Sequence, residues 1–133
     1  CDLRKVSWLI LNELEGQQMT GCSAAEPKKS LEQLRKRYPQ SACVLTLGTA
    51  GAYYQDAHTT VFQDTFRVKS VDSTGAGDTF TGFFLAGMTQ GCEAKQAMRR
   101  ATAAAAISVS RRGASASIPT DQEVRQFLDS ELP

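Results

Sequence analysis

The feature that most constrains the fold is the alternation of short apolar runs with longer segments of helical periodicity. Apolar residues dominate 6–11 and 42–47, a length typical of buried strands. Between these runs, residues 27–38 place Leu31 and Leu34 on one side and charged residues on the other, as in a surface helix. Strands that alternate with helices predict an α/β fold.

The remaining segments continue this alternation. We expect a hairpin of residues 52–55 and 59–62, a short strand at Phe66–Val68, a mostly apolar helix from Phe80 to about Gly91, a helix from Glu93 to Ser110, and an amphipathic helix from Asp121 to about Leu128, capped by Thr120 or Asp121.

The composition excludes several classes of protein. The 133 residues suffice for one domain, and a formal net charge of +1 provides no general attraction to nucleic acid or anionic membranes. Four scattered cysteines and the single His58 predict neither a zinc site nor a disulfide framework. The longest uncharged stretch, 79–92, is too short and polar to cross a bilayer, and the N-terminus does not resemble a signal peptide. We therefore expect a cytoplasmic protein that binds neither nucleic acid nor membrane.

The segment Gly75-Ala76-Gly77-Asp78 stands directly before the apolar helix. The first N–H groups of a helix lack intrahelical acceptors, and glycine allows a phosphate to approach them closely. Asp78 could accept a proton from an attacking hydroxyl beside such an anion hole. The alternative is structural: the glycines make a turn, and Asp78 interacts favourably with the helix dipole.

Four segments together resemble a known family. They are Asp72-Ser73-Thr74-Gly75-Ala76-Gly77-Asp78-Thr79-Phe80, Asn12-x-x-Glu15, Thr46-Leu47-Gly48-x-x-Gly51 and the late R-R-G-A-x-x-S-I-P. From about Val6 to Leu128, the chain resembles the carboxyl-terminal half of the ribokinase (PfkB) family of carbohydrate kinases. The resemblance implies a three-layer α/β/α ribokinase-like fold with a mostly parallel sheet. Residues 1–133 would form the nucleotide-binding and catalytic part of one domain, without the amino-terminal sugar-binding half and lid.

The resemblance also implies roles for the glycine-rich segment. Asp78 would be the catalytic base that deprotonates the acceptor hydroxyl, and Gly75, Ala76 and Gly77 would form the anion hole for the transferred phosphoryl group.

Other residues would contact the nucleotide and Mg²⁺. The implied nucleotide-binding residues are Asn12, Thr46, Gly48, Gly51, Gly77 and Thr102. Thr102 stands where relatives often carry Asn or His beside adenine. Glu15 would act on Mg²⁺ through its water shell, as suits a hard oxygen donor. The alternative for the segment beginning at Asn12 is a helix cap, and the alternative for Thr46 to Gly51 is an ordinary turn.

Many members of the family bind a monovalent cation beside the anion hole. Here Asp72 and Ser117 would supply side-chain oxygens, and carbonyl groups would come from Thr74, Ser108, Arg111 and Gly113. Such a set of oxygen donors suits K⁺ better than a transition metal. The alternative is that Asp72 caps a turn and Gly113 ends a helix.

The implied function is phosphorylation of a sugar hydroxyl by ATP. Ribose is the favoured acceptor, although fructose, ketodeoxygluconate and nucleoside kinases share the core motifs. The full-length protein would be a homodimer with ATP, Mg²⁺ and K⁺ as cofactors, and this part alone would be inactive. The alternative is a truncated kinase that serves only as a nucleotide-binding or interaction module.

Overall fold

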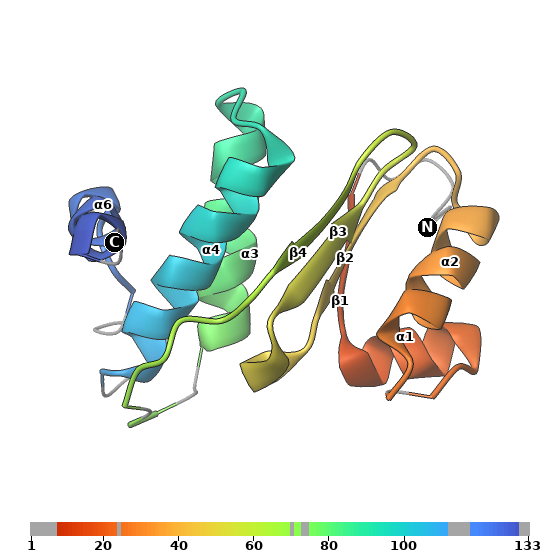
Figure 1. Cartoon of the computed structure of the whole chain (residues 1–133), viewed down its shortest axis with the longest axis horizontal. Coiled ribbons are helices and arrows are strands. Elements are labelled where there is room, and N and C mark those ends of the chain that lie inside the picture. Colours follow the sequence, from red (N-terminus) through yellow and green to blue (C-terminus); the bar gives the residue numbers. More distant parts are fainter. Residues whose placement is uncertain (1–7, 24, 70, 73–74, 112–117, 131–133) are drawn as a thin grey trace. The chain divides into compact units, whose positions relative to one another are not determined.

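The computed structural model describes residues 8–23, 25–69, 71–72, 75–111 and 118–130 (Figure 1). The chain divides into two compact units, 1–62 and 63–133. Each unit has its own secondary structure and its own buried residues. No helix among the described residues is both long enough and apolar enough to span a membrane.

A four-stranded sheet organises the first unit. Its strands are β1 (Trp8–Asn12), β2 (Ala42–Thr46), β3 (Ala52–Gln55) and β4 (Thr60–Gln63), in the order β1-β2-β3-β4. β1 and β2 are parallel, whereas β2 and β3 are antiparallel. The sheet is therefore mixed, and its parallel pair brings the carboxyl ends of β1 and β2 to one edge.

Helices α1 (Glu13–Thr20) and α2 (Pro27–Arg37) cover one face of this sheet (Figure 1). Proline at the start of α2 costs no hydrogen bond, because the first N–H groups of a helix have no intrahelical acceptor. Leu31 and Leu34 from α2 pack with Leu9, Cys43 and Leu45 from the strands. This apolar layer holds α2 over the sheet and positions the strand ends.

The described part of the second unit consists mostly of the helices α3 (Ala76–Thr89), α4 (Ala94–Val109) and α6 (Asp121–Ser130). α3 and α4 lie side by side (Figure 1). At Gly87 a Cβ would lie 3.2 Å from the Cβ of Ala97, so glycine permits this close approach. α6 packs on α4 through Val124, which is fully buried against Ala103, Ala104 and Ile107.

Most of the expected elements are confirmed, with boundaries shifted by a few residues. The strand expected at Phe66–Val68 is wrong, since residues 64–69 have no regular secondary structure. The Phe66 ring instead packs edge-on against Phe127, with centroids 5.3 Å apart, and lies 5.4 Å from the guanidinium carbon of Arg99. Side chains from helices therefore fix this segment, rather than a strand ladder.

Candidate active site

Two of the expected nucleotide-binding residues lie side by side at the carboxyl edge of the sheet. Asn12 and Thr46 are register partners at the ends of β1 and β2, and the Thr46 hydroxyl donates to the Leu11 carbonyl at 3.4 Å. Ligand sites in α/β sheets form at the carboxyl ends of parallel strands. The structure thus brings together two residues that are 34 positions apart in the sequence.

Asn12 and Glu15 form a reciprocal cap at the start of α1. The Glu15 N–H donates to Asn12 Oδ1 at 2.8 Å, and the Asn12 N–H donates to Glu15 Oε1 at 3.0 Å. The helix cap, which the sequence offered as the alternative interpretation of this segment, is therefore present. Both side chains are exposed, and within the described part of the chain no hydrogen bond reaches the second carboxylate oxygen of Glu15. That oxygen fits a role on the water shell of Mg²⁺, because Mg²⁺ keeps several waters and prefers carboxylate oxygen.

The turn after β2 depends on two glycines. Gly48 has φ 58° and Gly51 has φ 106°, values that favour glycine over residues with a Cβ. The Leu47 N–H donates to the Gly51 carbonyl at 2.9 Å and closes the turn. A Cβ at Gly48 would meet no atom within 4 Å, so a ligand could approach the backbone there.

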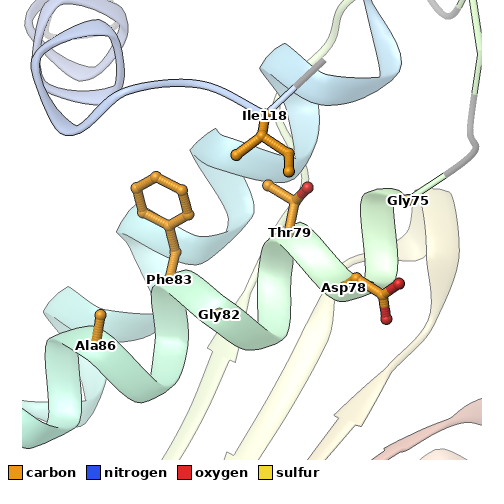
Figure 2. A pocket seen from close by; sticks show the side chains of 7 residues that line it. All are labelled: Gly75, Asp78, Thr79, Gly82, Phe83, Ala86 and Ile118. Carbon is orange, nitrogen blue, oxygen red and sulfur yellow. The ribbon is translucent and has the colours of Figure 1, made fainter. Parts of the chain in front are cut away.

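The second unit places Gly75 and Asp78 at the start of α3 (Figure 2). Gly75 is the N-cap with φ 81°, and no side chain caps the helix. The first intrahelical bond runs from the Thr79 N–H to the Gly75 carbonyl at 2.9 Å. The N–H groups of Ala76, Gly77 and Asp78 therefore precede the helical ladder, which is the geometry that binds an anion.

Asp78 is exposed in this first turn, and its carboxylate points away from the side chains of Thr79, Phe83 and Ile118 (Figure 2). Gly77 is also exposed, and a Cβ there would meet no atom within 4 Å. A proton acceptor and a set of backbone donors thus share one helical turn.

A pocket of about 560 Å³ extends from this turn along α3. It is lined by Gly75, Asp78, Thr79, Gly82, Phe83, Ala86 and Ile118 (Figure 2). The Thr79 hydroxyl is buried there and has no hydrogen-bond partner among the residues that the structure describes. Sequence reasoning did not identify Phe83 and Ile118 as pocket residues, because the sequence does not distinguish an apolar side chain that lines a pocket from one that belongs to the core.

Some of the expected cation ligands also lie together. The N–H groups of Val71 and Asp72 both donate to the Val109 carbonyl, at 2.6 and 3.0 Å. Asp72 is therefore joined to the end of α4, near Ser108 and Arg111. The carboxyl end of a helix favours cations because its last carbonyls have no intrahelical donors. The monovalent-cation site stays a prediction. Thr74, Gly113 and Ser117 lie outside the described residues.

Thr102 is buried inside the second unit. Its hydroxyl donates to the Met98 carbonyl at 2.7 Å. The adenine contact at this position stays a prediction, and the hydroxyl oxygen retains only its capacity to accept.

Two ion pairs connect α6 to α4 and to the residue that follows the C-cap of α4. Arg100 pairs with Asp121, and Arg111 pairs with Glu123. Glu123 and Thr120 also cap α6 reciprocally, with N–H donors at 3.0 and 3.2 Å. Hydrogen bonding from Arg111 is the main cause that lowers the pKa of Glu123 to about 2. Sequence reasoning identified Thr120 as a cap but not Glu123, although T-x-x-E is the signature of such a cap.

Residues 2–121 match the profile of the pfkB family carbohydrate kinases. A ribokinase of Haemophilus influenzae is 33% identical over 120 residues, which cover 89% of this chain and 39% of that relative. A ribokinase of Schizosaccharomyces pombe is 41% identical over 86 residues, 64% of this chain and 27% of the relative. The chain thus spans well under half of these relatives.

Solved structures show the same fold. Arabidopsis thaliana ribokinase complexed with ribose and ATP has a TM-score of 0.89 at 27% identity, over 98% of this chain and 43% of that one. A putative ribokinase II of E. coli in complex with ATP and Mg²⁺ has a TM-score of 0.87 at 26% identity, over 97% of this chain and 41% of that one. The ribokinase-like α/β class expected from the motifs is confirmed.

Proposed function

Because this chain belongs to the pfkB family of carbohydrate kinases, we propose that it serves the ATP-dependent phosphorylation of a sugar hydroxyl, which yields a sugar phosphate and ADP. One observation carries the proposal: α3 begins at Gly75 without a side-chain cap, and Asp78 is exposed in the same turn. Phosphoryl transfer needs both features, an acceptor for the hydroxyl proton and donors where phosphate charge accumulates.

Asp78 acts as the base in this proposal. Its carboxylate accepts the proton of the acceptor hydroxyl as the oxygen attacks the terminal phosphorus of ATP. The N–H groups at the start of α3 donate to the phosphoryl oxygens, and the absence of a Cβ at Gly77 leaves room for their approach. These groups are fixed before the reaction, so little reorganisation is needed in the transition state.

The first unit supplies the ATP side. Asn12 and Thr46 share the carboxyl edge of the sheet. In the turn that follows β2, Gly48 is exposed, so its backbone is accessible to the nucleotide, whereas Gly51 is buried. Glu15 offers its second carboxylate oxygen to the water shell of Mg²⁺. When bound, Mg²⁺ neutralises charge on the phosphate oxygens.

A monovalent cation, which we propose to be K⁺, binds beside the anion hole. Asp72 and the carbonyls of Ser108 and Arg111 contribute, together with Thr74, Gly113 and Ser117. The observation that supports this proposal is that the N–H groups of Val71 and Asp72 both donate to the Val109 carbonyl, which places Asp72 at the negative end of α4.

The acceptor in this proposal is ribose or a related sugar, and the sugar contacts come from a longer polypeptide. The chain spans 39% of the Haemophilus influenzae relative. The second candidate is a module that binds nucleotide without turnover.

The test measures ADP release by the full-length protein with ribose, deoxyribose, fructose, ketodeoxygluconate and nucleosides as acceptors. We expect turnover with ribose or a close analogue, and ATP binding without turnover by residues 1–133 alone. If ATP binds but no acceptor supports ADP release, the nucleotide-binding module is correct instead.

A further inference from the structure

The pocket along α3 continues past the catalytic turn as a row of small residues. Asp78, Gly82 and Ala86 are four residues apart, so they follow one another along one side of the helix. Gly82 and Ala86 are exposed, and a Cβ at Gly82 would meet no atom within 4 Å. The α3 groove, as this part of the pocket is named below, consists of Thr79, Gly82, Phe83, Ala86 and Ile118.

The other sides of α3 are covered. Phe80 and Phe84 are buried, and Gly87 admits α4 so closely that a Cβ there would lie 3.2 Å from the Cβ of Ala97. Asp78 is the only charged residue in α3, all of which the structure describes. A helix that is apolar on all sides is typically buried on all sides. The exposed groove is therefore the side of α3 at which the sequence and the surroundings disagree.

The hydroxyl of Thr79 is a second indication that the groove has an occupant. Thr20, Thr89 and Thr102 each donate to the carbonyl four residues earlier in their own helix. Thr79 is 5% exposed, and its hydroxyl has no hydrogen-bond partner among the described residues. Its side chain lies on the same side of α3 as that of Phe83 (Figure 2). Because an unpaired buried hydroxyl is costly, a polar group of the occupant is expected beside it.

The lining of the groove restricts the chemistry of this occupant. A sugar or a phosphate needs several polar partners, whereas the groove offers one hydroxyl among apolar and small side chains. Backbone N–H groups beyond the first turn of α3 are bonded within the helix. Small residues four apart admit instead the side-chain ridge of another helix. The chain spans 39% of the Haemophilus influenzae relative, so a polypeptide of that length has further segments that could supply one.

We propose that the α3 groove binds a helix of the longer polypeptide, from outside residues 1–133, through apolar side chains and one polar group that pairs with Thr79. The inference rests on the proposed function, in which the sugar contacts come from that longer polypeptide. The groove begins at Asp78, so the bound helix lies next to the proposed base. Docking in the groove thus holds the sugar contacts within reach of Asp78.

The test measures the rate at which N-ethylmaleimide labels Ala86→Cys, in residues 1–133 and in the full-length protein, without substrates. Mass spectrometry of peptides separates this thiol from the native cysteines. The control is Gln96→Cys, at an exposed position on α4 outside the groove. We expect both thiols to react at similar rates in residues 1–133. In the full-length protein, Ala86→Cys should react at least about tenfold more slowly, because labelling then requires local opening, and Gln96→Cys should be unchanged.

Gly82→Leu provides a second test that needs no thiol. In residues 1–133 the side chain enters open space and leucine favours the helix, so the melting temperature should not fall. In the full-length protein the same side chain occupies the place of the docked helix, so the melting temperature should fall. A change of the same sign in both proteins would contradict the docking.

Three labelling results would overturn the inference. Equal rates for Ala86→Cys in the two proteins would show that the longer polypeptide leaves the groove open. Slow labelling in residues 1–133 at every protein concentration would show that this chain covers the groove itself. Slowing that increases with concentration would identify a second copy as the occupant. Failure of the proposed function is separate: Ala86→Cys would be protected in the full-length protein, yet no acceptor would support ADP release.

Discussion

Gly75 and Gly77 belong to one motif, yet their substitution by alanine should change stability in opposite directions. Gly77 lies in the first turn of α3, and a Cβ there meets no atom within 4 Å. Alanine should therefore stabilise the protein by about 0.5–1 kcal/mol through reduced backbone entropy. Gly75 has φ 81°, and a Cβ in this left-handed region costs about 1–2 kcal/mol. The two variants should differ by about 1.5–3 kcal/mol in the free energy of unfolding.

Activity should separate from stability in the Gly77→Ala variant. The open space beside Gly77 is the space that the proposed phosphoryl group occupies, so a methyl group there should obstruct the anion hole. Loss of one oxyanion donor typically costs about 10²–10³ in kcat. We therefore expect a more stable protein whose full-length form has a kcat at least about a hundredfold lower.

The assays are urea unfolding followed by circular dichroism at 222 nm, and ADP release by the full-length protein. Comparable m-values would show that both variants unfold by the same transition. A Gly77→Ala protein that is stabilised and fully active would refute the anion hole and leave the glycines as a turn. Equal effects of the two substitutions on stability would refute the reasoning from backbone geometry.

Three further predictions concern folding. Asn12→Ala removes the cap of α1 and should lower the free energy of unfolding by about 1 kcal/mol in urea titrations; an unchanged midpoint would show that the cap contributes nothing. Burial alone would raise the pKa of Asp56, but hydrogen bonds from Tyr54 and two backbone N–H groups lower it. Because the folded carboxyl has the lower pKa, this contribution is present above its ordinary value of about 4 and is lost as the pH falls further. Unfolding measured from pH 6 to pH 2 should therefore be less pH-dependent in Asp56→Asn, and identical profiles would contradict the assignment. Phe84 is fully buried and Phe62 is 48% exposed. Phe84→Ala should therefore lower the free energy of unfolding by about 3–5 kcal/mol, and Phe62→Ala should lower it by about 1 kcal/mol. Similar losses of stability in the two variants would contradict the packing.

The helices with clear periodicity and clear ends could be predicted from the sequence. Pro27 begins α2, and the spacing of Leu31 and Leu34 defines its buried side. α1 was missed because its few apolar residues define no face, and its signal is the cap formed by Asn12 and Glu15. Phe66 was assigned to a strand because a short apolar run does not reveal whether a ladder or helix side chains will cover it.

The candidate site was predictable where a motif is local and not where the contacts are distant. Gly75 to Asp78 form one turn, so their proximity follows from sequence spacing. The double hydrogen bond from residues 71 and 72 to Val109 depends on how α4 packs, which no local pattern specifies. The same is true of the pair between Arg111 and Glu123, since periodicity places each residue on its own helix or helix end but does not match them.

The measurement that most directly tests the account is the turnover of Asp78→Asn in the full-length protein, with Asp129→Asn as the control. Asp129 is an exposed aspartate on α6 outside the candidate site. A neutral amide cannot accept the hydroxyl proton as a carboxylate does, so turnover should fall by about 10²–10⁴ while the Kd for ATP stays within about twofold. The control should retain full activity. An Asp78→Asn enzyme that phosphorylates its sugar at the unmodified rate would contradict the assignment of Asp78 as the base.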